Sequence, residues 1–438
     1  MPHRNALLLL VLPSLLAAQS SPAGKTLAAN LNLARQYLDE SRQLCQRDNG
    51  HLWGKPFCQP MMLVDRNTRF VVTSEPDLQG RLKNESGVYV GQLPPEVNIW
   101  NTSQLWAGKR WAQVMWPVPK DPSARREVLL HEQFHLIQPA LGIASRNPQN
   151  PQLDALDGRY LMQLELRALK RALSAQDYAQ QLQCIKDALL FRQRRWQLFP
   201  NAEDEETAVE LVEGTAAYTG VKLGTDGLAA QISYAVKRIE WQMNVRTFAR
   251  SFAYATGPAY GLLLDRHVSN WRELATKGYN PSEVLKLRLH WNPPVDLIAA
   301  TESRATEYDG KSLRGFEEAR ENLRHELFNK YRGLLVDGPV FWLPNAHMNV
   351  QQDPENLVQY ENIGTVYPRV RVVADWGILQ VSKAALIDPD RRGVAVPAPF
   401  KTSGMLVQGD GWALQLKDGW EVAAGQRAGD YRLRKTAR

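Results

Sequence analysis

The chain has 438 residues, of which 44% are hydrophobic and 23% charged, and its formal net charge is +7. This composition indicates a globular protein of about two or three domains and excludes a disordered chain. The positive excess is small and scattered along the sequence. Its densest run, Arg192, Arg194 and Arg195, favours a solvated helix face over a nucleic-acid-binding patch, so no nucleic-acid partner is expected.

The N-terminus has the layout of a secretory signal peptide. His3 and Arg4 precede an apolar stretch from Ala6 to Ala18, and small residues follow it. The apolar stretch is shorter than the roughly 20 residues that a membrane-spanning helix needs. We therefore expect residues 1–20 to be a signal peptide, and the mature protein to be secreted or periplasmic without a membrane span.

Export would place the three cysteines in an oxidising compartment. Cys45 and Cys58 are near enough in sequence to close a short loop through a disulfide, and Cys184 would then be left over on a helix. The alternative is that all three are unpaired small apolar residues. No pair has the spacing of a cysteine zinc site.

The predicted elements divide the mature chain into three parts, and the expected fold class is α+β. Residues 21–120 begin with a predicted helix and continue as short strands. Residues 121–335 are predicted to be mainly helical, and Asp121 and Pro122 suit the start of the first helix. Residues 336–438 show alternating runs between turn residues, which predict a separate all-β domain. The helices are expected at 25–46, 121–137, 153–173, 178–199, 205–223, 228–252, 282–289 and 315–335.

The most informative segment is LLHEQFHLIQP, from Leu129 to Pro139, which contains an HExxH motif. On a helix, His131 and His135 lie on one face about 6 Å apart, so both rings can bind one ion. Zinc lowers the pKa of a bound water, and Glu132 is close enough to take the proton of that water. Imidazole and carboxylate ligands suit Zn²⁺, so the segment predicts a zinc site.

Two acidic residues are candidates for the third metal ligand. Glu213 and Glu165 each fall on a predicted helix face made of small apolar residues. A carboxylate in such a place is costly unless it is paired or bound to a metal, so both remain open. Arg159 and Arg167 flank Glu165 in the sequence and could pair with it. The carboxylate that is not a ligand would orient a histidine ring.

HEQFH followed by EGTAAY resembles the gluzincin, or peptidase MA-like, zinc metallopeptidases. In that family HExxH supplies two ligands and the base, and a downstream glutamate, often in an EGLAEY-type segment, supplies the third ligand. The resemblance implies a zincin-like catalytic core, with His131, His135 and Glu213 as metal ligands and Glu132 as the base. The gap between the two motifs is longer here than is usual in the family, which keeps the alternative carboxylate in consideration.

A metallopeptidase also needs a hydrogen-bond donor for the developing oxyanion. The segment RSFAYATGPAYGLLLDRH contains Tyr254, Tyr260 and His267, and its Gly-Pro break would allow a loop that brings Tyr254 or Tyr260 to the metal. Tyr218, close to Glu213, is another candidate. For each of these residues the alternative is packing in the core.

These features together predict an exported, Zn²⁺-dependent metallopeptidase that hydrolyses peptide or protein substrates with Glu132 as the base. One alternative is a catalytically inactive, peptidase-like envelope or secreted protein that binds its partner through the β domain. Another is a metal-dependent hydrolase acting on substrates other than peptides. The sequence contains no GxGxxG or Walker pattern and no G-x-S-x-G nucleophile elbow.

Overall fold

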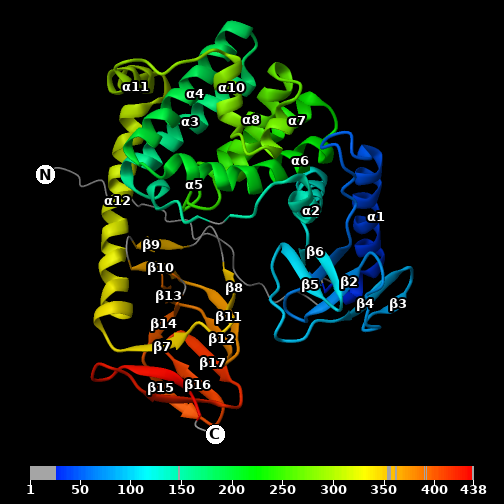
Figure 1. Ribbon diagram of the computed structural model, residues 1–438, viewed down its shortest axis with the longest axis vertical. Coiled ribbons are helices and arrows are strands. Elements are labelled where there is room, and N and C mark those ends of the chain that lie inside the picture. The colour runs from blue at the N-terminus through cyan, green and yellow to red at the C-terminus, as the bar shows by residue number, and fades with distance from the viewer. Residues whose placement is uncertain are drawn as a thin grey trace, which may run out of the picture.

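The computed structural model describes residues 26–146, 148–352, 357–360, 363–388, 390 and 392–436. The predicted signal peptide lies outside these residues. The protein is a mixed α+β fold, as expected, with a helical body and two β units that both lie below it in the view of Figure 1. In the described part of the chain, no helix has both the length and the apolar character needed to cross a bilayer.

The N-terminal unit consists of helix α1 (Leu31–Asp48) and a six-stranded sheet. Its strands are β1 (Met61–Asp65), β2 (Phe70–Thr73), β3 (Lys83–Glu85), β4 (Val88–Gln92), β5 (Thr102–Trp106) and β6 (Lys109–Trp116). The strand order is β3-β4-β2-β1-β6-β5, and only the β1–β6 pair is parallel. A disulfide between Cys45 and Cys58 joins the end of α1 to the segment before β1, whereas Cys184 is free and buried.

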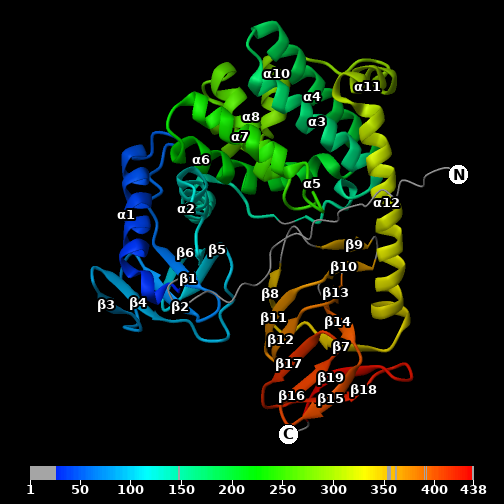
Figure 2. The same cartoon turned by 180° about the vertical axis from the view of Figure 1, so that it is seen from behind.

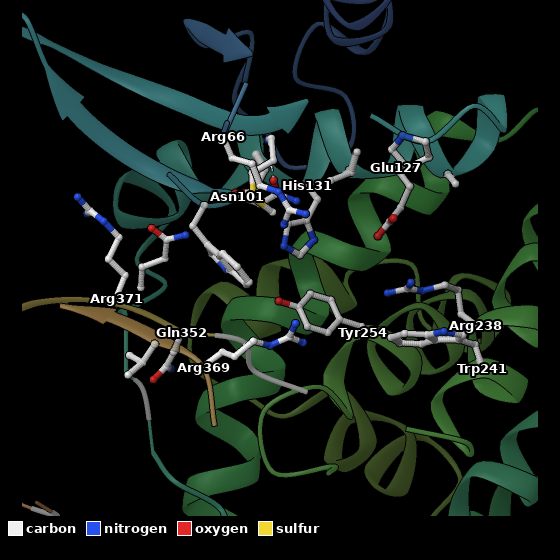
Figure 3. A pocket seen from close by; sticks show the side chains of 18 of the residues that line it. Arg66, Asn101, Glu127, His131, Arg238, Trp241, Tyr254, Gln352, Arg369 and Arg371 are labelled. Carbon is white, nitrogen blue, oxygen red and sulfur yellow. Dashed lines mark hydrogen bonds between the residues drawn. The ribbon is translucent and has the colours of Figure 1, made fainter. Parts of the chain in front are cut away.

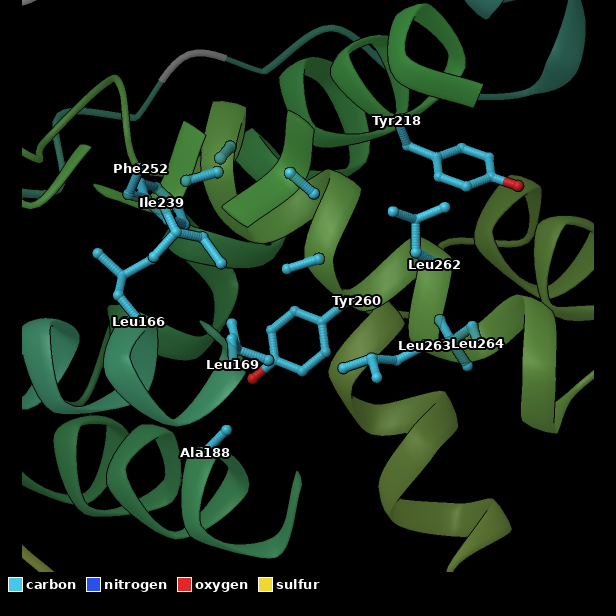
Figure 4. Close-up of a cluster of buried hydrophobic side chains, with 14 of the residues drawn as sticks. Leu166, Leu169, Ala188, Tyr218, Ile239, Phe252, Tyr260, Leu262, Leu263 and Leu264 are labelled. Carbon is cyan, nitrogen blue, oxygen red and sulfur yellow. The ribbon is translucent and has the colours of Figure 1, made fainter. Parts of the chain in front are cut away.

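The helical body forms the middle of the chain. Its helices are α2 (Pro122–Ile137), η3 (Gln138–Leu141), α3 (Leu156–Ser174), α4 (Tyr178–Leu198), α5 (Ala202–Val209), η5 (Glu210–Gly214), α6 (Thr215–Gly224), α7 (Leu228–Gln242), α8 (Ala253–His267), α9 (Trp271–Thr276), α10 (Pro281–Arg288), α11 (Leu297–Ala305), α12 (Gly310–Arg332) and η7 (Gly333–Asp337). Asp121 caps α2, because its side chain accepts a hydrogen bond from Ala124 N at 2.9 Å. Apolar side chains of α3, α7 and α8 form the centre of this body (Figure 4).

The region after α7 differs from the prediction. The helix expected over 228–252 ends at Gln242, and residues 253–267 form a second helix, α8, that continues through Pro258. Proline usually ends or kinks a helix, but α8 is buried along almost its whole length. It also packs backbone to backbone against η5, since a Cβ on Gly257 would lie 2.3 Å from Gly214 Cα. The close approach of α8 to η5 therefore depends on glycine at position 257.

The C-terminal β domain consists of two sheets that pack face to face. Its strands are β7 (Val340–Pro344), β8 (Asn349–Gln352), β9 (Val358–Tyr360), β10 (Gly364–Tyr367), β11 (Val370–Ala374), β12 (Gly377–Val381), β13 (Ala385–Ile387), β14 (Gly393–Pro397), β15 (Pro399–Ser403), β16 (Leu406–Gly409), β17 (Trp412–Leu416), β18 (Trp420–Ala424) and β19 (Tyr431–Lys435). The sheet orders are β18-β19-β7-β14-β13-β10-β9 and β15-β16-β17-β12-β11-β8. Apolar side chains of both sheets share one core, and the outer face of the first sheet packs on the end of α12 and on η7.

Helix α12 runs from the helical body to the β domain (Figures 1 and 2). The β domain also contacts the N-terminal unit, because Asn98 Nδ2 donates to Asn349 O and Ile99 N donates to Gln351 Oε1, both at 3.1 Å. Arg371 of β11 donates to the Asn98 side chain as well. The three units therefore surround a shared space beside α2.

Candidate metal centre

Helix α2 presents the HExxH motif to this shared space. Leu129 is buried in the core of the N-terminal sheet, and Phe134 is buried in the core of the helical body. These two apolar contacts fix the rotation of α2 and leave His131, Glu132 and His135 lining a cavity. The motif spacing therefore places both imidazoles on the cavity face, as the sequence predicts.

Glu213 completes a group of three potential ligands. Its Oε2 lies 3.3 Å from His131 Nε2 and 3.4 Å from His135 Nε2, and the two Nε2 atoms are 2.9 Å apart. Glu213 lies in η5, a π-helical turn of the kind often found at functional sites. In the described part of the chain, these three side chains are the cluster whose ligand atoms all lie within 4.8 Å of one another.

The geometry of this group fits a zinc ion. Tetrahedral coordination with bonds of about 2.0–2.1 Å places ligand atoms about 3.3 Å apart. The two distances from Glu213 are close to this value, whereas the two Nε2 atoms, at 2.9 Å, would have to move slightly apart to bind the ion. Gln138 Oε1 lies 2.8 Å from Nδ1 of His135 and can accept a hydrogen bond from the Nδ1–H group. This keeps the proton of the neutral ring on Nδ1 and leaves Nε2 with a lone pair for a metal. Gln138 Nε2 in turn donates to Val212 O at 2.6 Å, so it links α2 to the segment that carries Glu213.

The electrostatics also favour a bound cation. Burial lowers the pKa of His135, but the carboxylates of Glu213 and Glu132 and the hydrogen bond to Gln138 together outweigh it and raise that pKa to about 9. Burial would raise the pKa of Glu213, yet the two imidazoles hold it well below its ordinary value. Buried atoms without a hydrogen-bond partner among the described residues include His131 Nδ1, Glu132 Oε2 and Glu213 Oε2. Polar atoms of this kind are costly to bury, and a shared cation offsets that cost.

Glu132 and Tyr254 stand beside the three ligands (Figure 3 shows Tyr254 with His131). Burial raises the pKa of Glu132, although the two imidazoles oppose this effect. The ring of Tyr254 lies 5.5 Å from that of His131, centroid to centroid. Burial and the carboxylates of Glu213 and Glu132 hold the pKa of Tyr254 well above its ordinary value, so its hydroxyl keeps its proton and can donate it in a hydrogen bond.

Glu165 and Tyr260 lie elsewhere, and their predicted roles at the metal are wrong. Glu165 Oε1 accepts from Arg192 Nε and from the Tyr260 hydroxyl, each at 2.8 Å, and its Oε2 accepts from Arg195 at 2.8 Å. These side chains are completely or almost completely buried. The solvated face expected for the arginine run is therefore also wrong for Arg192 and Arg195, although Arg194 is partly exposed.

The remaining candidates have partners outside the metal centre. The expected pairing of Glu165 with its flanking arginines does not occur. The observed partners are Glu317 for Arg159, Asp309 for Arg167, Asp265 for Tyr218 and Tyr178 for His267. A role for Gln138 was not predicted from the sequence. Its position three residues after His135, which makes the two side chains neighbours on a helix, could have indicated one.

Two cavities meet at the metal centre, with volumes of about 760 Å³ and 560 Å³. Both are lined by His131, Glu132 and Tyr254 of the helical body, and by residues of the N-terminal sheet and the β domain. The candidate metal centre therefore lies where the two cavities meet.

The chain matches no protein-family model, no curated protein and no solved structure. Its resemblance to the gluzincins consequently stands on the two sequence motifs.

Proposed function

We propose that the protein is a zinc-dependent metallopeptidase. The observation that carries this proposal is the convergence of His131, His135 and Glu213, with the carboxylate of Glu132 beside them. Three protein ligands of the types His, His and Glu are typical of catalytic zinc sites, which keep one coordination position for water or substrate.

Each residue of the site has a distinct role in the proposed reaction. Zinc, when bound, supplies a Lewis acid that lowers the pKa of a coordinated water. Glu132 accepts a proton there and later returns it to the leaving amine. Tyr254 keeps its proton and donates a hydrogen bond to the oxyanion that develops on the scissile carbonyl. Gln138 holds the ring of His135 in the orientation that exposes Nε2.

The surroundings of the site favour a peptide substrate. Strand β5 is at the edge of its sheet, and Thr102, Ser103 and Gln104 line the same cavity as both imidazoles. An edge strand has unpaired backbone N–H and C=O groups, to which an extended peptide can add as a further strand. Both cavities reach the candidate metal centre, with volumes of about 760 Å³ and 560 Å³, so there is room for several residues of an extended peptide.

The test combines metal analysis with cleavage of a broad peptide library. We expect near-stoichiometric zinc in the purified protein and cleavage of library peptides. The Glu132→Gln variant should keep its zinc and lose at least about a hundredfold in kcat/KM, as expected for loss of a general base. Glu203→Gln, an exposed acid on α5, is the matched control and should behave as wild type.

Two results would contradict the proposal in different ways. Full activity in Glu132→Gln with zinc retained would remove Glu132 as the base. A folded wild-type protein without zinc or peptidase activity would favour the inactive binding protein.

We further propose that the protein acts outside the cytoplasm. Residues 1–20 have the pattern of a signal peptide, and the bond between Cys45 and Cys58 is of a kind that persists in oxidising compartments. Terminal sequencing of the mature protein and thiol counting under denaturing conditions test this proposal. One free thiol, that of Cys184, is expected.

A further inference from the structure

The larger of the two cavities carries an excess of positive charge. Four arginines and two glutamates line it, namely Arg66, Arg238, Arg369, Arg371, Glu127 and Glu132. The arginines come from the turn after β1, from α7, from the residue before β11 and from β11 itself, so distant parts of the sequence bring them together. Figure 3 shows Arg66, Arg238 and Arg369 around the space that His131 and Tyr254 face, and Arg371 at its edge with its guanidinium group turned outward.

Three of these arginines lack an ionic partner. Among the described residues, no carboxylate lies within ion-pair distance of Arg66, Arg238 or Arg371, although ion pairs are numerous elsewhere in the protein. Arg371 donates to neutral oxygens of a side-chain amide and a backbone carbonyl. Arg238 lies over the rings of Trp241 and Tyr254, at 5.3 Å and 5.8 Å from their centroids.

The two acids of this cavity do not balance its charge. Glu127 interacts with the Tyr234 hydroxyl, and Glu132 stands at the metal centre. Burial and the nearby Arg69 both lower the pKa of Arg371, and Glu96 opposes them only in part. Cationic groups inside a concave, partly enclosed space attract anions strongly, and guanidinium groups bind carboxylates with two parallel hydrogen bonds.

The smaller cavity is more evenly charged, because its described lining includes three arginines and two glutamates, namely Arg110, Arg146, Arg250, Glu132 and Glu213. Its Arg146 makes two hydrogen bonds with Asp204, at 2.8 Å and 2.6 Å. Its Arg110 donates to the Ser103 hydroxyl at 2.9 Å. The larger cavity, which contains three arginines without an ion pair among the described residues, is therefore the one better suited to an anionic ligand.

We propose that the larger cavity binds acidic side chains of the substrate, so that the enzyme prefers peptide bonds flanked on one side by Asp or Glu. The proposal rests on the proposed peptidase function and adds a substrate class to it. Trp100 and Trp241 also line this cavity and offer apolar surface to the methylene groups of such residues. An acidic polypeptide is thus the substrate whose chemistry matches the cavity wall.

The cleavage test uses peptides that are identical except for Glu or Gln at the positions flanking the scissile bond. Wild type should cleave the Glu peptide about tenfold faster in kcat/KM, as expected for charge-assisted hydrogen bonds. This preference should fall toward one in the Arg66→Gln/Arg238→Gln double variant, and it should weaken with added salt. Arg432→Gln, an exposed arginine on β19 outside both cavities, is the charge-matched control and should keep the preference.

A binding test separates this proposal from the proposed function. Zinc-loaded Glu132→Gln protein is titrated with the same fluorescent peptides, and the Glu peptide should bind about tenfold more tightly. Tighter binding without cleavage by wild type would support the acidic-ligand site and reject the peptidase. Equal affinity for the Glu and Gln peptides would overturn the acidic-ligand site even if both peptides are cleaved. Displacement of the Glu peptide by an equal concentration of a single-stranded oligonucleotide would also overturn it, because the cavity would then bind polyanions in general.

Discussion

Two carboxylates of the helical body, Glu165 fully buried and Glu213 partly buried, show how the same residue type serves different purposes. Glu165 is enclosed by Arg192, Arg195 and Tyr260, and its oxygens accept hydrogen bonds from all three. Glu213 faces two imidazoles, and its Oε2 has no hydrogen-bond partner among the described residues. The first carboxylate has permanent cationic partners, whereas the second has partners whose charge depends on a proton or a metal.

Burial of an acidic side chain therefore indicates that it needs a partner, but it does not indicate which partner. Permanent guanidinium charges complete an ion-pair cluster and leave nothing for a metal to bind. Imidazoles supply lone pairs instead, so a carboxylate among them remains a potential ligand. The two regions are also connected, because Glu210, three residues before Glu213, pairs with Arg192 and accepts from the Thr256 hydroxyl of α8.

The largest expected effect comes from breaking the ion-pair cluster. Arg192→Met leaves Glu165 and Glu210 buried without one of their main cationic partners, which should cost about 3–5 kcal/mol of unfolding free energy. Urea denaturation of the metal-free protein measures this loss. Arg194→Met is the matched control on the same helix, since Arg194 bonds only the exposed Gln197, and it should change stability by less than about 0.5 kcal/mol. Equal stability of the two variants would show that the cluster does not support the fold.

The next effect separates the two carboxylates directly. Glu213→Gln should weaken zinc binding by at least about a hundredfold, or roughly 2.7 kcal/mol, because it removes a ligand. Glu165→Gln should retain zinc, because its side chain is turned toward the arginines. Competition with a chromophoric chelator gives both dissociation constants. Loss of zinc in Glu165→Gln with retention in Glu213→Gln would reverse the assignment.

The HExxH half of the site could be predicted from the sequence because it depends on one helix. The period of α2 fixes the relation between His131 and His135, and Asp121 marks the start of that helix. The burial pattern alone left Glu213 and Glu165 both open as the third ligand, and only the family resemblance favoured Glu213, because the choice depends on where α4 places Arg192 and Arg195. Those arginines are three residues apart on one helix face, which is compatible with both a solvated face and an inward-facing pair.

Other features depend on contacts between segments that are distant in the sequence, so local sequence patterns could not predict them. The continuation of α8 through Pro258 depends on the burial of that helix and on the contact of Gly257 with Gly214. That contact brings Tyr254 to the metal centre, whereas Tyr260 falls on the side of α8 that faces Glu165. The arginines of the larger cavity likewise come from segments that no sequence pattern brings together.

A smaller effect is expected from Gln138, which links His135 of α2 to Val212 of η5. Gln138→Leu removes the acceptor for His135 Nδ1 and the donor to Val212 O, so it should weaken zinc binding about tenfold. Gln138→Glu keeps an acceptor beside Nδ1 and should restore most of the affinity. The same chelator competition measures both variants. Equal weakening in the two would mean that Gln138 acts only through packing.

The smallest expected effect is the pH dependence of the ion-pair cluster. Burial would raise the pKa of Glu165, but Arg192 and Arg195 have the stronger effect and lower it below its ordinary value of 4.5. A carboxyl with a lowered folded-state pKa contributes stability above the unfolded-state value and loses that contribution as the pH falls through the folded-state value.

The unfolding free energy of the wild type should therefore exceed that of Glu165→Gln by a constant amount near neutral pH. This gap should shrink below about pH 4.5, by about 1.4 kcal/mol for each unit by which the pKa is lowered. Denaturation with a chelator present excludes any contribution from metal binding at Glu213. If the difference in unfolding free energy stays constant down to the acid transition, the arginines do not hold Glu165 in its charged form. The contrast between Glu165 and Glu213 would then rest on geometry alone.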